Sequence, residues 1–436
     1  NVMPTNNVTS FINDHNVDQN FSASWTADGF ERLRTYLGSV KAGQPKVYTA
    51  PFAKGQSMAK VLEDWKKVLV SVKTRWPSLW DYEIDQAGKV GPMSVQLPLE
   101  ERLDDIRHYY EDILLSSTPI SQSAMKAVVA EFAKVSVRIR PQRETLDKMK
   151  KSTNSGNPWF TKKRNVSQDI IPCEIEHTSN EIYARIQDEL WNLTAVIGWR
   201  GQEGGPSEED TKQRVVWMFP FALNLCELQV YQPLIESAQA RNVVPAWVSM
   251  ESVDREVTML FDTKPSNDLI VCTDFSKFDQ HFNEHLQQSA KTILAELLTK
   301  SKEANEWLDW VFPAKYLIRL AWETNGADVS YLIGRHGMAS GSGGTNVDET
   351  LAHRSLQYEV AIQHHTRLNP HSMCLGDDGI LTYPGITVDD VVAAYTAHGQ
   401  ECNKEKQYAA TQDCVYLRRW HHAGYRDNGV CVGVYP

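Results

Sequence analysis

The sequence lacks the features that define several protein classes. Its seven cysteines are scattered through 436 residues, with no Cys-x-x-Cys pair among them. This spacing argues against a disulfide framework and a zinc site, and it is typical of a reducing compartment. The longest apolar run, VVWMFPFAL at 215–223, is far too short for a membrane span and is broken by Pro220. The first thirty residues hold no apolar stretch of signal-peptide length, and we expect no membrane partner.

Net positive charge is also absent. The chain carries −10 at pH 7, which by itself speaks against nucleic-acid binding. Positive charge is nevertheless concentrated over 134–164, where ten lysines and arginines stand against two acidic residues. This segment is either a solvated basic helix and loop or a local patch for phosphate contacts, and its composition alone favours neither.

The sequence does contain a hydrophobic fraction of 42% and enough aromatic residues for a large core. Residues 20–150 have apolar positions at helical spacing and predict a mostly helical region, and a helix is expected over 224–240. Polar, Gly- and Pro-rich stretches at 153–160 and 198–221 predict loops. From 268 onward the predicted order is strand, helices, strand, helix, hairpin, helix and strand. The predicted fold class is therefore α+β, with helices packed on one face of a mainly antiparallel sheet.

Residues 371–383, HSMCLGDDGILTY, combine a strong turn signal with two adjacent acids. Asp-Gly between apolar runs is typical of an ordinary hairpin, and Gly376 and Gly379 would let the hairpin bend. Asp377 and Asp378 repel each other and need cations or solvent. Taken alone, the segment therefore fits a plain turn or a place where a metal ion meets a phosphate.

A third acid favours the metal interpretation. Asp274 ends a predicted buried strand over 269–273, where a simple capping role is equally compatible with the pattern. If the sheet brings Asp274 and Asp377 onto adjacent strand ends, the pair can hold two divalent cations roughly 3.5–4 Å apart. Mg²⁺ suits such an incomplete carboxylate cage, because waters and substrate phosphates complete its coordination.

Two further stretches complete the pattern. The loop SGSGGT, at 340–345, precedes a helix predicted to begin near Thr345, with Thr345 and Asn346 as its caps, and its glycines allow backbone to approach a bulky ligand. Lys212 and Arg214 precede an apolar run. They are either a solvated charge run or cations that neutralise a triphosphate, as phosphoryl transfer requires.

In order and spacing, these stretches resemble the motifs of viral RNA-dependent RNA polymerases. The corresponding stretches are DFSKFDQHF (274–282, motif A), SGSGGT (motif B), LGDDG (375–379, motif C), KEK (404–406, motif D), YLRRW (416–420, motif E), KQRVVWMFP (212–220, motif F) and SGNP (155–158, motif G). The residues of motifs A and B are most similar to those of picobirnavirus-type polymerases, from small double-stranded RNA viruses, with partitivirus polymerases next.

The resemblance implies a right-hand polymerase fold whose palm has an antiparallel sheet packed on helices. Fingers are expected over 1–264, with motif G near 152–164 and motif F near 198–219. The palm is expected over 265–420, with fingers helices inserted at about 283–330, and the start of a thumb over 421–436. Only sixteen residues follow Trp420, and the chain begins with Asn1, so we expect a fragment with a truncated thumb.

The resemblance also implies roles for individual residues. The metal-binding and catalytic candidates are Asp274, Asp377 and Asp378, the last as a secondary ligand or an electrostatic partner. The catalytic candidate for proton donation to pyrophosphate is Lys406, and Lys404 fits nearly as well. The nucleotide-binding candidates are Arg200, Lys212 and Arg214 at the triphosphate, Asp279 at the ribose hydroxyls, and Ser340, Gly341, Thr345 and Asn346 in motif B. The RNA-binding candidates are Ser155, Gly156, Lys162, Lys163, Arg164, Arg418 and Arg419.

One position departs from the family pattern. Many relatives carry an Asn four residues after the motif B Thr, bonded to the motif A acid and the 2′-hydroxyl. Here that position is Glu349, which puts this route of ribose selection in doubt. Asn346 is the candidate substitute.

The implied reaction is template-directed attack of an RNA 3′-hydroxyl on a ribonucleoside triphosphate, by a two-metal mechanism with Mg²⁺ or Mn²⁺, for viral genome replication and transcription. The implied partners are the RNA template, nascent RNA and nucleotides, with a capsid protein as a further candidate, in the virion interior and host cytoplasm. One alternative is a reverse transcriptase, which expects an aromatic residue where this chain has Leu375 and lacks such a Ser-Gly loop. The other is a catalytically silent RNA-binding structural protein, against which the intact acidic and basic motif residues argue.

Overall fold

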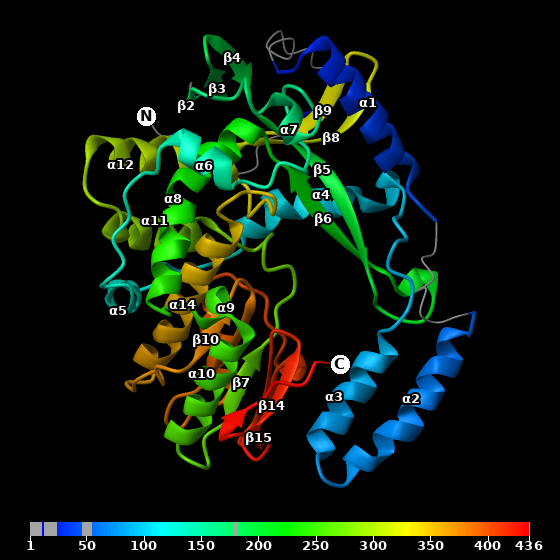
Figure 1. Ribbon diagram of the computed structural model, residues 1–436, viewed down its shortest axis with the longest axis vertical. Coiled ribbons are helices and arrows are strands. Elements are labelled where there is room, and N and C mark those ends of the chain that lie inside the picture. The colour runs from blue at the N-terminus through cyan, green and yellow to red at the C-terminus, as the bar shows by residue number, and fades with distance from the viewer. Residues whose placement is uncertain (1–10, 13–23, 46–54, 178–180, 436) are drawn as a thin grey trace.

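Two β-sheets organise the computed structural model, which describes residues 11–12, 24–45, 55–177 and 181–435. In Figure 1 the five-stranded sheet lies in the upper half of the molecule and the four-stranded sheet in the lower half. Helices pack around both sheets, so the predicted α+β class is confirmed. No helix of the described residues is long and apolar enough to cross a membrane.

The helices are mostly short, and their bounds follow the chain in order. They are α1 Ala27–Ala42, α2 Met58–Lys73, α3 Pro77–Gly88, α4 Leu103–Glu111, α5 Gln122–Glu131, α6 Gln142–Lys148, α7 Lys163–Val166, α8 Phe221–Ala240, α9 Pro245–Val248, α10 Met250–Thr263, α11 Glu284–Leu297, α12 Lys302–Glu306, α13 Ala314–Leu317, α14 Thr345–Gln363 and α15 Val388–Ala397.

The strands belong to the two large sheets and to three small ones. They are β1 Phe11–Ile12, β2 Cys173–His177, β3 Ile182–Ile186, β4 Glu189–Asn192, β5 Thr194–Gln202, β6 Lys212–Met218, β7 Ile270–Thr273, β8 Arg319–Asn325, β9 Asp328–Leu332, β10 Met373–Leu375, β11 Asp378–Leu381, β12 Tyr408–Ala410, β13 Asp413–Tyr416, β14 Arg419–His422, β15 Arg426–Asp427 and β16 Val430–Cys431.

The five-stranded sheet has the order β1-β9-β8-β5-β6 and corrects two expectations. Residues 198–221, predicted as a loop, contain most of the long β5–β6 hairpin, because Gly- and Pro-rich residues interrupt only its tip. The segment at about 283–330, predicted as inserted helices, ends in strands. β8 pairs in parallel with β5 and antiparallel with β9, so the second half of this insertion completes the same sheet.

The four-stranded sheet has the order β10-β11-β7-β12, and all its pairs are antiparallel. β7 lies inside this sheet and all four of its residues are buried, which explains its unbroken apolar run. The register pairs Thr273 of β7 with Gly379 of β11. The end of β7 and the turn before β11 therefore lie at one edge.

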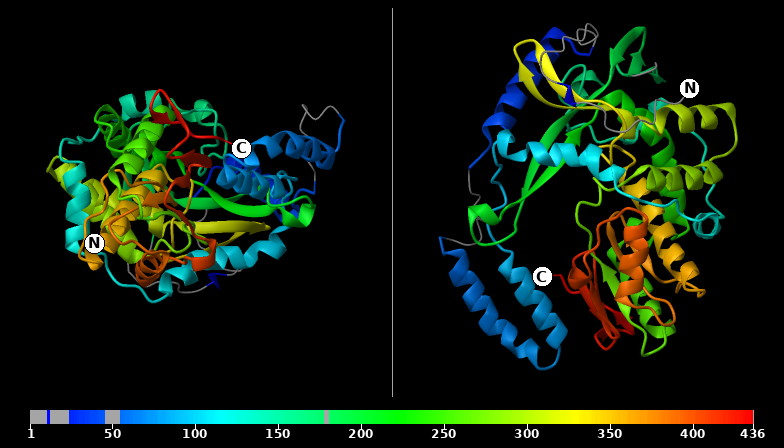
Figure 2. Two further views of the ribbon diagram at one scale, coloured as in Figure 1. Left: turned by 90° about the horizontal axis from the view of Figure 1, so that it is seen from below. Right: turned by 180° about the vertical axis from the view of Figure 1, so that it is seen from behind.

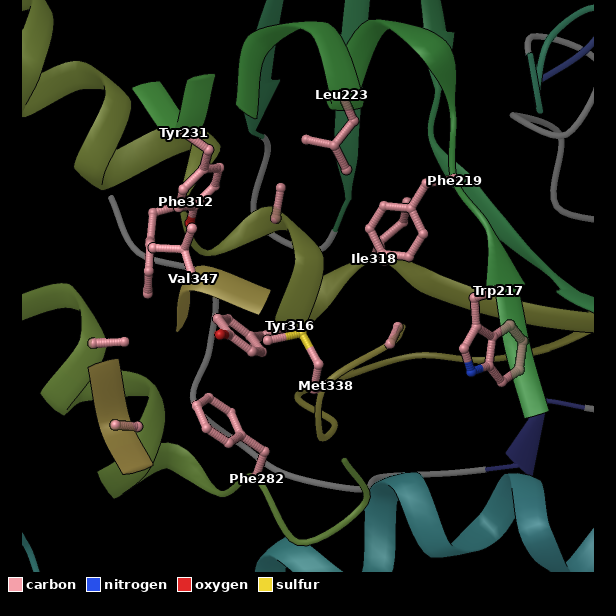
Figure 3. Packing of buried hydrophobic residues seen from close by; sticks show 14 of the residues in the cluster. Trp217, Phe219, Leu223, Tyr231, Phe282, Phe312, Tyr316, Ile318, Met338 and Val347 are labelled. Atoms are coloured by element: carbon pink, nitrogen blue, oxygen red, sulfur yellow. The ribbon is translucent and has the colours of Figure 1, made fainter. Parts of the chain in front are cut away.

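The main hydrophobic core connects the two sheets. Figure 3 shows Trp217 and Phe219 from the end of β6 on one side, and Tyr231 of α8, Phe312, Tyr316 of α13 and Val347 of α14 on the other. Met338 and Phe282 lie between them, just before the two segments that carry motif B and α11. A second, smaller core joins α10 to the four-stranded sheet through residues such as Val257, Leu260 and Ile380.

The C-terminal region differs from the single strand predicted around 415–420. Residues 413–422 form a hairpin, β13–β14, whose turn residues Leu417 and Arg418 both have positive φ. The second hairpin, β15–β16, lies within 421–435 and packs on α10. α2 and α3 stand apart from the other helices, and α3 lies between α2 and these C-terminal strands (Figures 1 and 2).

Candidate active site

Two acids meet at the edge of the four-stranded sheet. Asp274 directly follows β7, and Asp377 stands in the two-residue turn between β10 and β11, after Gly376 with φ +58°. Both side chains are exposed. Protein nevertheless crowds Asp377 on most sides, and this burial raises its pKa, with the charge of Asp274 adding to the rise. The two strand ends are neighbours, as the sequence predicted.

The backbone of Asp274 is fixed by a residue that sequence reasoning missed. Gln407, just before β12, accepts a hydrogen bond from the Asp274 amide through Oε1 (2.8 Å) and donates one to the Asp274 carbonyl through Nε2 (2.8 Å). A glutamine in a polar run gives no signal of such a role in a single sequence. Its neighbour Lys406 is thereby brought close to the end of β7.

Helix α14 holds the turn that carries Asp377. Thr350 Oγ1 accepts a hydrogen bond from the Gly376 amide (2.9 Å), and His353 Nδ1 bonds the Gly376 carbonyl (2.9 Å). Burial lowers the pKa of His353 to about 4, so the ring is neutral and Nδ1 donates. Gly379 was expected to help the hairpin bend. It lies instead within β11, where a Cβ would meet His353 Cε1 at 2.7 Å, so close packing requires this glycine.

Asp378 is bonded to the hairpin formed by β13 and β14. Its Oδ2 accepts a hydrogen bond from the Leu417 amide (2.8 Å), in the turn between β13 and β14. Burial raises the pKa of Asp378 to about 7, and the charges of Asp377 and Asp274 act in the same direction. This hydrogen bond opposes the rise.

The donor set of the two outer acids fits Mg²⁺. Within the ranges that the structure describes, no three His, Cys, Asp or Glu side chains form a group that could hold a metal ion by itself. Asp274 and Asp377 offer hard oxygen ligands whose mutual repulsion a bound cation would relieve. Mg²⁺ typically takes one or two protein carboxylates and completes its coordination with waters and phosphates. Asp378 differs from these two acids, because one of its carboxylate oxygens accepts a hydrogen bond from the Leu417 amide.

Three cations share one face of the β5–β6 hairpin. The register pairs Arg200 directly with Arg214, and Lys212 lies two residues from Arg214, so all three project to the same side. All three are exposed. Like charges directly opposite each other destabilise a hairpin, which an anion between them would relieve. The charge of Arg214 opposes the rise in the pKa of Asp377 and of Asp279, so this face lies near the acids.

The motif B loop packs on the end of β6. The Trp217 amide donates a hydrogen bond to the Ser340 carbonyl (2.9 Å). A Cβ on Gly341 would meet the Trp217 carbonyl oxygen at 1.8 Å, and Gly341 has φ +148°, so only glycine fits here. The close contact joins motif B to the strand that carries the three cations.

Thr345 and Asn346 do not cap α14 as predicted. The helix begins at Thr345, so the cap position is Gly344, which has no side chain to offer. The Thr345 hydroxyl donates instead to the Ser342 carbonyl (3.2 Å). Asn346 Oδ1 accepts a hydrogen bond from the Trp247 indole (2.7 Å), and its predicted contact with the nucleotide stays a prediction.

Glu349 forms an acid pair with Asp279 at the position where relatives carry Asn. Burial, followed by the charge of Asp279, raises the pKa of Glu349 well above its ordinary value. The two carboxyl groups interact directly, and Ser340 lies close enough to Asp279 to lower its pKa. Two carboxyl groups can share a hydrogen bond only when one carries a proton, and the stronger rise in pKa at Glu349 makes it the donor of the pair. Its Oε2 is buried and has no hydrogen-bond partner among the described residues.

A second buried acid is hydrogen-bonded to the motif B loop. Glu227 of α8 accepts hydrogen bonds from the Ser342 hydroxyl and from the Gly343 amide (3.3 Å to Oε1). Burial raises the pKa of Glu227 to about 7, against the charge of Lys315. The side chain of Lys315 pairs with Asp348 at 3.0 Å, and both are fully buried.

The basic residues of motifs D and E divide into bound and free side chains. Lys404 forms an ion pair with Asp389 (2.8 Å), whereas Lys406 has none within the described part of the chain. Arg419, expected at the RNA phosphates, pairs instead with Asp254 (2.8 Å), because it begins β14 and packs against α10. Arg418, in the turn, is exposed.

The motif G residues divide in the same way. Ser155 is fully buried, and its carbonyl accepts a hydrogen bond from the Phe221 amide (2.8 Å), while Gly156 packs in the same loop. Lys163, expected to bind RNA, is 6% exposed and donates to the Asn154 carbonyl (2.9 Å). The exposed cations here are Lys162 and Arg164.

Comparison with known proteins shows the family of the chain. A family model for viral RNA-dependent RNA polymerases matches residues 99–429. The chain belongs to this family. A relative named a potential RNA-dependent RNA polymerase, of human picobirnavirus (strain Human/Thailand/Hy005102/-), is 55% identical over 404 residues, 92% of this chain and 75% of the relative. The crystal structure of the RNA-dependent RNA polymerase of a human picobirnavirus matches with a TM-score of 0.92 and 53% identity, over 96% of this chain and 79% of that one. An insertion-loop deletion mutant of that enzyme matches with the same TM-score and identity, over 96% of this chain and 82% of the mutant chain.

The resemblance to picobirnavirus polymerases is thus confirmed, and the chain is an RNA-directed RNA polymerase of a double-stranded RNA virus type. Its mixed fold matches that of the solved picobirnavirus enzymes. The proposed division into fingers, palm and thumb, and the roles of the individual residues, stay predictions.

Proposed function

We propose that this polymerase extends an RNA strand on an RNA template by a two-metal mechanism, and that it replicates and transcribes a viral genome. The observation that carries the proposal is the proximity of two opposite charge sets. The cations Arg200, Lys212 and Arg214 share one hairpin face, and the acids Asp274 and Asp377 lie near it. Phosphoryl transfer depends mainly on positioning and charge stabilisation, and these sets can supply both.

In this proposal Asp274 and Asp377 hold two Mg²⁺ ions, for which Mn²⁺ can substitute. The ions, when bound, lower the pKa of the attacking hydroxyl and stabilise the leaving pyrophosphate. Gln407 keeps the Asp274 backbone in place through its paired hydrogen bonds. Lys406 is favoured as the proton donor to pyrophosphate over Lys404, whose ammonium group pairs with Asp389.

The nucleotide would lie between the β5–β6 hairpin and the palm. The three hairpin cations bind its triphosphate, and Asp279, oriented by Glu349, accepts a hydrogen bond from a ribose hydroxyl. The loop that contains Ser340, Gly341 and Thr345 follows the template and the nascent base pair, which its contact with β6 supports.

The RNA contacts are proposed at exposed cations only. Lys162 and Arg164 meet the template strand and Arg418 meets the primer strand, since phosphate contacts position a strand without reading its sequence. We further propose that the enzyme works in the virion interior and the host cytoplasm, with the viral capsid protein as a partner.

The test is RNA-templated incorporation of labelled ribonucleotides with Mg²⁺ or Mn²⁺. The chain is compared with Asp377→Asn and with a matched control, Asp188→Asn. Asp188 also stands in a two-residue hairpin turn, between β3 and β4, after Gln187 with φ +55°. Template-dependent incorporation that Asp377→Asn abolishes and Asp188→Asn keeps is expected. No incorporation by the wild type, with RNA binding retained, would replace the proposal by a silent RNA-binding role.

A further inference from the structure

The turn of the β13–β14 hairpin has an unusual backbone. Tyr416 pairs with Arg419, so the loop contains only Leu417 and Arg418, with φ +54° and +60°. A two-residue turn of this kind normally uses Asn and Gly, because both residues must adopt the left-handed region. Leu and Arg are unfavourable there, and such a conformation persists only when the surroundings enforce it.

Two hydrogen bonds from outside the hairpin enforce this turn. Asp378 Oδ2 accepts a bond from the Leu417 amide (2.8 Å), and the Tyr82 hydroxyl of α3 donates to the Arg418 carbonyl (2.9 Å). One bond comes from the catalytic hairpin and the other from a helix more than three hundred residues away in sequence. We call Asp378, Tyr82, Leu417 and Arg418 the turn latch.

The strands of the same hairpin are fixed independently of the turn latch. The Trp420 indole donates to Ser78 of α3 (3.0 Å), and Trp76 packs edge-on against Trp420 with 6.0 Å between ring centroids. On the other strand face Arg419 is paired with Asp254 at 2.8 Å. Figures 1 and 2 show α3 beside these C-terminal strands. Loss of one latch bond should therefore release the turn without detaching the hairpin.

Arg418 is the group that the latch positions. Its side chain is exposed and forms no ion pair with any described residue, in contrast to its neighbour Arg419. Its backbone is held next to Asp378, which is itself adjacent in sequence to Asp377. In the proposed function the 3′ end of the growing strand must reach Asp377, and the turn that carries Arg418 is bonded to the next residue, Asp378.

We propose that Asp378 is a positioning residue: with Tyr82, it holds the Leu417–Arg418 turn in its left-handed backbone so that Arg418 meets the phosphates of the primer strand beside the catalytic acids. The proposal rests on the proposed polymerase function. It assigns Asp378 a task other than metal binding and links α3 to the grip on the primer.

The two roles of Asp378 predict opposite changes in RNA affinity without metal. Removing a metal ligand in EDTA leaves RNA binding unchanged, or strengthens it, because a negative charge near the phosphates disappears. Removing the latch weakens binding, because Arg418 loses its position. The difference in sign makes the measurement decisive.

The experiment is fluorescence anisotropy with a labelled primer–template RNA in EDTA, on the full chain. Asp378→Ala is expected to raise the Kd roughly two- to tenfold, the range that one hydrogen bond supports. Asp378→Asn, which keeps an oxygen acceptor for the Leu417 amide, should bind as the wild type does. Tyr82→Phe removes only a hydroxyl and should raise the Kd over the same range, with an unchanged melting temperature.

A second-site change tests the mechanism. Leu417→Asn favours the left-handed turn by itself, so adding it to Asp378→Ala should restore most of the lost affinity. Primer extension with Mg²⁺ should show the Tyr82→Phe effect in KM for primer–template and much less in kcat. Unchanged or tighter binding by Asp378→Ala, or no effect of Tyr82→Phe, would overturn the latch while leaving the polymerase function intact. A wild type that incorporates no nucleotide would instead refute the function on which the latch rests.

Discussion

Glu349 offers a quantitative test of how this polymerase distinguishes ribose from deoxyribose. The protonated Glu349 carboxyl donates to Asp279, whose carboxylate we propose as the acceptor for the 2′-hydroxyl. Glu349→Leu keeps the bulk of the side chain but removes the donor. Glu349→Gln keeps an N–H donor in a side chain that cannot ionise.

The size of the effect follows from the chemistry of the pair. A hydrogen bond to a charged group contributes about 1.5–3 kcal/mol, and Asp279 would lose one such bond in a site where it is also near Asp377. For Glu349→Leu this corresponds to a roughly 10- to 150-fold lower kcat/KM for ATP. Incorporation of dATP, which has no 2′-hydroxyl to bind, should fall much less, so the ATP/dATP ratio should move toward one. Glu349→Gln should stay within about threefold of the wild type.

The assay is single-nucleotide extension with ATP and dATP over a series of pH values. The raised pKa means that Glu349 keeps its proton below that pKa and loses it as the pH rises through it. The wild type should therefore discriminate less well at the high end of the pH series than at the low end, whereas Glu349→Gln should discriminate equally throughout. Equal loss of ATP and dATP incorporation in Glu349→Leu, or loss of discrimination in Glu349→Gln at pH 7, would refute the role of the shared proton.

Three further predictions concern the supports of the site. Arg200→Gln should raise KM for nucleotides roughly tenfold, which is the value of one charge-assisted hydrogen bond. It should also raise the melting temperature at low salt, because the repulsion between Arg200 and Arg214 disappears. Nucleotide KM and thermal unfolding, measured on the same variant, check both effects. Gln407→Leu should lower kcat about tenfold through loss of its two bonds to Asp274, while primer–template affinity measured by anisotropy stays unchanged. Glu227 has a pKa raised to about 7, so its ionisation makes the wild type less stable as the pH rises from about 4.5 to 7. Glu227→Gln should therefore be more stable at pH 8 by about 3 kcal/mol or less and nearly equal at pH 5, as denaturant unfolding at the two values would show; a larger gain at pH 5 would contradict the sign.

Much of the site was predictable because its motifs are local. The buried run that ends at Asp274 and the Asp-Gly turn at 377–379 each specify a strand end, and a sheet that pairs them was the simplest arrangement. The start of α14 near Thr345 was likewise predicted, although the cap is Gly344 and not the predicted Thr345 and Asn346. In these cases neighbouring residues determine the geometry.

The parts that could not be predicted depend on partners far away in sequence. In the sequence Arg418 and Arg419 look equivalent as a basic pair. The left-handed turn leaves Arg418 exposed and lets Arg419 pair with Asp254, and no Gly or Asn in the sequence predicts such a turn. Asn346 resembles a ribose ligand by composition, but Trp247 binds its amide oxygen. Gln407 carries no charge and follows no pattern, although it fixes the first acid of the site.

Whether Asp274 and Asp377 together hold the catalytic cations can be observed by anomalous diffraction from Mn²⁺, in crystals of this polymerase with primer–template RNA and a non-reactive ATP analogue. We expect two Mn²⁺ peaks roughly 3.5–4 Å apart, coordinated by oxygens of both acids and of the triphosphate. Asp378 Oδ2 should remain on the Leu417 amide, as in the present structure. Mn²⁺ bound without Asp274 or Asp377, or held by Asp378 with the Leu417 bond broken, would contradict the assignment of these residues.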